Sequence, residues 1–108
     1  MIYELRVYHT VPGRLPALVK RFDTITCGLF EKHGIKQVGF WNVLIGESTT
    51  DLVYMLQFDS LADREKKFAA FAADPEWIEA RAKTEADGPI VATITNTILT
   101  PTSFSALK

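Results

Sequence analysis

Two histidines are the side chains of this sequence best suited to acid–base or metal chemistry near neutral pH. His33 is in phase with the apolar positions of a helical pattern and precedes Gly34, where a positive charge would meet the carbonyl end of the helix. This place favours a capping role, and a role in a ligand pocket is the alternative. His9 stands at the end of a strand pattern, where we expect a solvated side chain. Two isolated histidines do not make a metal site, so no bound metal is predicted.

Glu4 and Arg6 are charged residues two positions apart in a strand pattern, so their side chains point to the same face. Leu5 and Val7 fall on the opposite face, whose apolar character suits a surface beneath helices. We therefore predict that Glu4 and Arg6 lie in the interior of a dimer, toward the partner subunit. Buried charges must be paired, and an ion pair that sets the strand register is favoured over a role in chemistry.

Trp41 and Tyr54 are aromatic residues in strand patterns. Such residues are usually core, and the alternative is that they line a ligand pocket together with His33. Cys27 has no base beside it in the sequence and is expected to be a small buried hydrophobe. Nucleophile motifs, phosphate-binding glycine loops and metal-ligand spacings are absent, so the sequence predicts no cofactor.

A strand and a long helix are predicted in the first third of the chain. Apolar and polar residues alternate from Ile2 until Pro12-Gly13, which is the period of a half-buried strand. From Arg14 to His33 the apolar residues recur three or four positions apart, which predicts one amphipathic helix. Gly34 is then the residue that ends this helix.

Three further strands are predicted in segments that are rich in β-branched and aromatic residues. Residues 35–45 and 52–58 predict a hairpin, because a short polar segment joins them. Residues 90–99 predict the last strand, with threonines on one face and mostly apolar residues on the other.

Two helix starts are predicted between the hairpin and the last strand. Ser60 and Asp63 form a capping box that opens a helix extending through Ala73. Asp74 and Pro75 then restart the helix, as N-cap and first helical residue. The order of elements is β-α-β-β-α-β. It predicts a ferredoxin-like α+β fold with a four-stranded antiparallel sheet and both helices on one face.

Composition predicts a single domain that associates with itself. With 108 residues, a sheet covered on one side only is marginal, and we place the core at residues 1–100 and a C-terminal tail at 101–108. The chain is 47% hydrophobic and 11% aromatic, which is more apolar surface than one monomer needs. A homodimer is the simplest arrangement that buries that surface.

Charge and hydropathy exclude several classes of partner. The net charge of −1, without a cluster of Lys or Arg, argues against nucleic acid. No apolar run is long enough to span a bilayer, and the first residues lack a signal-peptide pattern. With Cys27 as the single cysteine, we expect a reducing, cytoplasmic location.

Sequence blocks distributed over every predicted element resemble the NIPSNAP family. In order, these blocks are Tyr3-Glu4-Leu5-Arg6, Pro12-Gly13-Arg14-Leu15, Glu31-Lys32-His33-Gly34, Val38-Gly39-Phe40-Trp41, Ile45-Gly46, Asp59-Ser60-Leu61-Ala62 and Ala73-Asp74-Pro75-Glu76-Trp77. The resemblance implies a dimeric α+β barrel, in which two sheets close face to face. It also implies a superfamily that includes cofactor-free monooxygenases and haem-degrading enzymes. Haem is not expected here, because the resemblance puts the axial histidine in residues 60–88, which contain none.

Two functions from different classes remain open. The favoured one is a dimer that binds a small molecule or a partner and has no evident catalytic motif. The alternative is a cofactor-independent monooxygenase or isomerase that acts on an aromatic or polyketide-like substrate in a pocket between helices and sheet.

Overall fold

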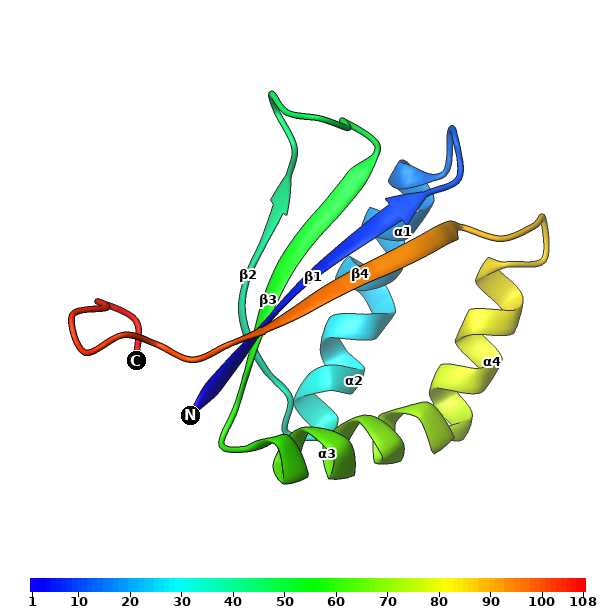
Figure 1. The fold of residues 1–108 in the computed structure, drawn as a ribbon. Coiled ribbons are helices and arrows are strands. Elements are labelled where there is room, and N and C mark those ends of the chain that lie inside the picture. The colour runs from blue at the N-terminus through cyan, green and yellow to red at the C-terminus, as the bar shows by residue number, and fades with distance from the viewer.

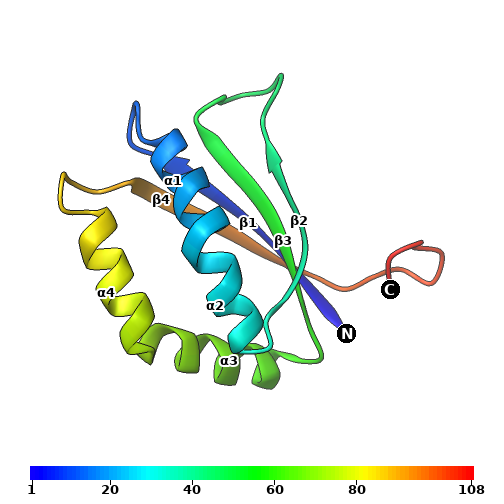
Figure 2. The same cartoon turned by 180° about the vertical axis from the view of Figure 1, so that it is seen from behind.

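A computed structural model describes all residues from 1 to 108. It contains four strands and five helical segments, which are β1 (Ile2–Thr10), α1 (Leu15–Arg21), η1 (Phe22–Thr26), α2 (Cys27–Lys32), β2 (Lys36–Asn42), β3 (Asp51–Phe58), α3 (Leu61–Ala73), α4 (Pro75–Thr84) and β4 (Val91–Leu99). The sheet is antiparallel throughout, with strand order β2-β3-β1-β4. Figures 1 and 2 show the helices on one side of this sheet and the C-terminal tail beyond its end. The predicted ferredoxin-like α+β class is therefore confirmed.

The first helix is one continuous rod with a π turn in its middle. At this turn the Cys27 N–H bonds to the Phe22 carbonyl, five residues back, instead of four. The extra residue shifts the side chains that follow it around the helix axis, and Phe22 and Thr26 are both buried. Gly34 ends the rod with φ of 71°, a left-handed conformation that favours glycine.

The predicted caps of the later helices are confirmed. Ser60 Oγ accepts a hydrogen bond from the Asp63 N–H at 3.1 Å, at the start of α3. Asp74 Oδ1 accepts one from the Glu76 N–H at 2.9 Å, and Pro75 is the first residue of α4. This second start lets the chain change direction between α3 and α4 (Figure 1). None of the helices combines the length and the apolar character needed to cross a bilayer.

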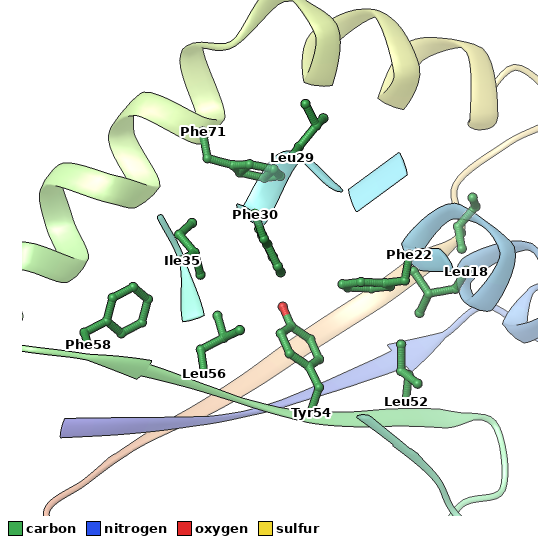
Figure 3. Packing of buried hydrophobic residues seen from close by; sticks show 11 residues of the cluster. Leu18, Phe22, Leu29, Phe30, Ile35, Leu52, Tyr54, Leu56, Phe58 and Phe71 are labelled. Carbon is green, nitrogen blue, oxygen red and sulfur yellow. The ribbon is translucent and has the colours of Figure 1, made fainter. Parts of the chain in front are cut away.

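The core lies between the helices and one face of the sheet. Alternate residues of β3 point from the sheet toward the helices, among them Tyr54 and Leu56 (Figure 3). They meet aromatic side chains from the helices. The buried cluster consists of Leu18, Phe22, Leu29, Phe30, Ile35, Leu52, Tyr54, Leu56, Phe58, Phe71 and Ile90.

The prediction that Glu4 and Arg6 face away from the helices is wrong. Arg6 lies opposite Tyr54 in the β1–β3 ladder, so it shares the face that carries the core. Glu4 accepts a hydrogen bond from Arg64 on α3, which fixes the same orientation. The prediction assumed that the apolar face of β1 lies beneath the helices. In the structure a charged network is buried there instead.

The opposite face of the sheet carries no helix and has an apolar patch, with threonines of β4 beside it. Trp41 is the largest side chain on it and is 50% exposed. A Cβ atom on Gly39 would lie 2.8 Å from two atoms of the Trp41 ring, so glycine lets this ring lie flat against the sheet. We name this surface the open sheet face. Its apolar residues are Tyr3, Leu5, Val7, Trp41, Val53, Met55 and Leu99, and the threonines beside them on β4 are Thr93, Thr95 and Thr97.

Candidate ligand-binding site

A cavity of about 440 Å³ lies between the helices and strands β1 and β4. Its volume falls within the range of roughly 300–1,000 Å³ that is usual for small-molecule sites. We name it the helix–sheet cavity. Ten of its sixteen lining residues are hydrophobic, and its aromatic lining consists of Tyr8, Phe22, Phe30, Phe68, Phe71 and Trp77. Such a lining suits a ligand with an apolar body.

The charged residues that line the helix–sheet cavity are mostly positive. They are Arg6, Arg21 and Arg81, with Glu85 as the single acid. The whole chain has a net charge of −1, so this local excess of two positive charges is not a property of the surface as a whole. The two ends of the cavity differ in how their arginines are paired.

The Arg6 guanidinium is held by three polar partners. Its Nε donates to the Tyr54 hydroxyl at 2.7 Å, Nη1 to Glu4 Oε2 at 2.7 Å, and Nη2 to the Tyr8 hydroxyl at 3.2 Å. Its Cζ also lies 5.0 Å from the centre of the Phe68 ring. Burial alone would lower the pKa of Arg6, but Tyr54, Tyr8 and Glu4 beside it raise that pKa above its usual value. Arg6 is thus a fixed cation in which each of the three guanidinium nitrogens donates a hydrogen bond.

Glu4 supplies the negative charge behind this wall of the cavity. Its side chain is 0% exposed and accepts hydrogen bonds from Arg64 at 2.6 Å and from Asn96 at 2.9 Å, in addition to Arg6. Burial raises the pKa of Glu4, but these donors outweigh it and hold the pKa below its ordinary value. Glu4 is therefore ionised at neutral pH and connects β1 to α3 and β4.

Tyr8 presents a hydroxyl group to the cavity. This hydroxyl accepts hydrogen bonds from Tyr54 at 2.9 Å and from Arg6 at 3.2 Å. Burial raises the pKa of Tyr54, so Tyr54 keeps its proton and remains a donor. Since a hydroxyl has two acceptor sites and one proton, the proton of Tyr8 is left for an oxygen atom of a ligand.

Arg21 is the poorly paired arginine of the cavity. It is 5% exposed, and its Nη1 donates to Thr84 Oγ1 at 3.3 Å and lies 3.9 Å from Glu85 Oε2. Its buried Nε has no hydrogen-bond partner. The guanidinium lies over the Trp77 ring, with Cζ 5.2 Å from its centre. Burial lowers the pKa of Arg21, and the charge of Glu85 offsets this only in part.

The structure does not bring the three predicted ligand-binding residues together. Trp41 lies on the open sheet face, away from the helix–sheet cavity. Tyr54 belongs to the core and reaches the cavity wall only through its hydrogen bonds to Arg6 and Tyr8. His33 ends α2 with its Nε2 2.7 Å from Asp74 Oδ2, which joins the first helix to the start of α4.

His9 and Cys27, the other candidates from the sequence, have surroundings that indicate structural roles. His9 Nδ1 lies 2.9 Å from Asp51 Oδ1 of the neighbouring strand. Burial raises the pKa of the Cys27 thiol, as do the charges of Asp23 and Glu31, so the thiol stays protonated near neutral pH. No three side chains of the kinds that bind metals lie close enough to hold an ion.

Arg21, Arg81 and Tyr8 were missed as site residues in the sequence. Arg21 carries a usable signal, because it falls three residues after Leu18 and four before Ile25, within the apolar stripe of the helix. A charge in phase with such a stripe is either paired in the core or part of a site. Tyr8 has no comparable signal, since a tyrosine in a strand is ordinary.

The fold and this cavity define a ferredoxin-like α+β protein with a ligand-sized pocket between its helices and its sheet. The NIPSNAP family model matches residues 3–106, and the chain belongs to the NIPSNAP family.

Solved structures agree with this assignment. The chain is 30% identical to a NIPSNAP family protein of unknown function from Agrobacterium tumefaciens, covering 100% of this chain and 94% of that one with a TM-score of 0.87. An uncharacterised NIPSNAP domain protein from Burkholderia xenovorans is 21% identical, covering 97% and 98% of the two chains with a TM-score of 0.83. No curated protein matches the chain.

A more distant likeness concerns the fold alone. A candidate antibiotic biosynthesis monooxygenase from Nitrosomonas europaea is 13% identical, with a TM-score of 0.62. The match covers 94% of this chain and 98% of that one. At this identity the shared architecture carries no information about the reaction.

Proposed function

We propose that this chain binds a small apolar molecule in the helix–sheet cavity. The supporting observation is a cavity of about 440 Å³ with an aromatic lining and a few polar groups at its walls. Sites of this kind usually bind small molecules, since the apolar wall supplies affinity and the polar groups supply orientation. The Arg6 network suits such a site, because it fixes polar groups before a ligand arrives.

Binding can be tested with the neutral fluorescent dye phenylnaphthylamine. We expect saturable binding of one dye molecule per chain, and we expect Ala72→Phe to abolish it, because Ala72 lines the cavity and phenylalanine would fill it. The matched control is Ala70→Phe, because Ala70 is exposed, lies two residues away on the same helix and is outside the cavity lining. Fluorescence titration of the three proteins measures this. Absent binding to the wild-type chain, or equal losses in both variants, would overturn the proposal.

The alternative function is a cofactor-independent monooxygenase or isomerase acting on an aromatic or polyketide-like substrate. One observation favours it. The Tyr8 hydroxyl accepts two hydrogen bonds and can direct its own proton into the cavity, where it could polarise a carbonyl or phenol oxygen. Simple binding needs fewer assumptions, because it requires no base and no reaction with oxygen.

The second part of the proposal is that the protein works as a homodimer through the open sheet face. The support for this is the apolar patch of that face, which includes half-exposed Trp41. A monomer would leave this patch in water, and a second copy offers the same apolar patch in return. A stable interface of this type buries roughly 1,600 Å² in total.

We expect a species of twice the 12.1 kDa chain mass in sedimentation velocity. Val53→Glu should convert it to a monomer, because Val53 lies at the centre of the open sheet face between Val7 and Trp41. Val19→Glu is the matched control, since Val19 is exposed on α1, on the helix side of the molecule. A wild-type monomer at micromolar concentration would contradict the dimer.

A cytoplasmic location is the third part of the proposal. Its support is the single cysteine, Cys27, which has no disulfide partner within the chain. Proteins that work in oxidising compartments more often use paired cysteines.

A further inference from the structure

The two arginine-containing ends of the helix–sheet cavity differ in charge balance. At the Arg6 end, Glu4 compensates the charge, and two tyrosine hydroxyls accept hydrogen bonds from the other two guanidinium nitrogens. At the other end, Glu85 is the single carboxylate in contact with both Arg21, at 3.9 Å, and Arg81, at 3.0 Å. The carboxylate is nearer to Arg81, so the buried charge of Arg21 is the less compensated of the two.

Arg21 is also short of hydrogen-bond acceptors. A guanidinium has five N–H donors in a fixed plane. Arg21 has one hydrogen bond, to Thr84, and its buried Nε has none. An unpaired donor and a weakly compensated charge are both unfavourable in an apolar cavity, and an anionic oxygen placed there would relieve both.

We infer that the helix–sheet cavity is selective for an apolar acid, a molecule with an apolar body and one carboxylate or similar anionic group that binds at Arg21. The apolar body would lie against Phe22, Phe30 and Phe71, and the anionic group would lie between Arg21 and Arg81. A small inorganic anion would leave the aromatic lining unused, and a neutral apolar molecule would leave Arg21 unpaired. The inference rests on the proposed ligand binding and adds the chemical class of the ligand.

Two dyes with the same ring system separate the apolar and the anionic contributions. Phenylnaphthylamine is neutral, and anilinonaphthalene sulfonate carries one sulfonate on the same rings. The quantity to measure is the ratio of their affinities for each protein, because a change in the apolar cavity affects both dyes alike. A change in the charged groups affects the sulfonate alone.

Arg21→Gln is expected to weaken binding of anilinonaphthalene sulfonate by about tenfold, which is the usual effect of losing one charged hydrogen bond. Binding of phenylnaphthylamine should be unchanged, which also shows that the variant is folded. Lys20→Gln is the matched control, because it removes the same charge from the adjacent, exposed position of α1 without altering the cavity. Its affinity ratio should equal that of the wild type.

Glu85→Gln tests the inference in the opposite direction and does not depend on how well Arg21 variants fold. This change removes the acid that competes for Arg21 and Arg81. Binding of anilinonaphthalene sulfonate should therefore become severalfold tighter, with phenylnaphthylamine unchanged. If Glu85 had a structural role alone, its loss would weaken both dyes or neither.

Two results would overturn the inference and leave the proposed function intact. One is binding of phenylnaphthylamine in the cavity with the same affinity ratio in wild type, Arg21→Gln and Lys20→Gln. The other is a ratio that does not rise in Glu85→Gln. If neither dye binds, or if Ala72→Phe leaves both bound, the proposed function itself fails.

Discussion

Glu4→Gln is expected to lower the free energy of unfolding by about 3–5 kcal/mol, the usual effect of removing one partner from a buried ion pair. The change keeps the shape of the side chain but removes the charge that faces Arg6 and Arg64. It also places an amide N–H₂ group, which donates, where arginine donors now find an acceptor. Urea unfolding followed by circular dichroism measures the difference.

The chain offers a matched control for this variant. Glu65 also pairs with Arg64, at 3.1 Å, but it is exposed on α3. Glu65→Gln should therefore change the free energy of unfolding by less than about 0.5 kcal/mol. The double variant Glu4→Gln with Arg64→Met should lose less stability than the sum of the two single variants. Additive losses would mean that the two side chains do not interact in the folded protein.

The same carboxylate predicts a dependence of stability on pH. The pKa of Glu4 is lower in the folded chain than its ordinary value, because arginine and asparagine donors outweigh the effect of burial. A group whose pKa falls on folding contributes stability above its unfolded pKa, about 4.3 for glutamate, and loses it as the pH falls further. Wild-type stability should therefore decrease below about pH 4 more steeply than that of Glu4→Gln.

Asp74 contributes to the same acid-sensitive range. The Lys32 ammonium, His33 and the Glu76 N–H hold the pKa of Asp74 well below its ordinary value. Its contribution is thus also present near neutral pH and is lost in acid. Asp74 is unchanged in Glu4→Gln, so it does not affect the comparison between the two proteins.

The helix boundaries could be predicted from the sequence because they depend on neighbouring residues. The hydrogen bond from the Asp63 N–H to Ser60 spans three residues, and the helix start at Asp74 and Pro75 spans two. Gly34 ends the first helix for a similar local reason. The order of these elements was enough for the ferredoxin-like class.

The covered face of the sheet could not be predicted in the same way. Alternation in β1 shows that Glu4 and Arg6 lie on one face and Leu5 and Val7 on the other, but it does not show which face the helices cover. That choice depends on Arg64, sixty residues further along the chain, which binds Glu4 from α3. A single strand pattern contains no information about such a distant partner.

The candidate site could not be predicted from local sequence patterns either. The spacing of apolar residues placed Phe22 and Thr26 on the buried stripe of the helix, but the π turn at η1 could not be predicted from that spacing. The cavity then combines residues from both ends of the chain, with Arg21 near the start and Arg81 near β4. Trp41 was chosen for its residue type, yet its strand position puts it on the open sheet face.

Phe30→Ala is the second variant with a large expected effect. Phe30 is 2% exposed, and its ring centre lies 5.0 Å from that of Phe71 and 6.2 Å from that of Phe22. Truncation of a buried phenylalanine usually lowers the free energy of unfolding by about 3–5 kcal/mol. Phe30 also lines the helix–sheet cavity, so its loss should join the cavity to the space left in the core.

Phe104→Ala is the matched control for this substitution, because Phe104 lies in the C-terminal tail and is 87% exposed. We expect it to change the free energy of unfolding by less than about 0.5 kcal/mol, as is usual for surface positions. Saturating phenylnaphthylamine should restore part of the stability lost in Phe30→Ala, since a ligand that binds only the folded state stabilises it. If Phe30→Ala were no more destabilising than Phe104→Ala, the helices could not be packed on the sheet through Phe30. The cavity would then lack the aromatic wall on which ligand binding depends.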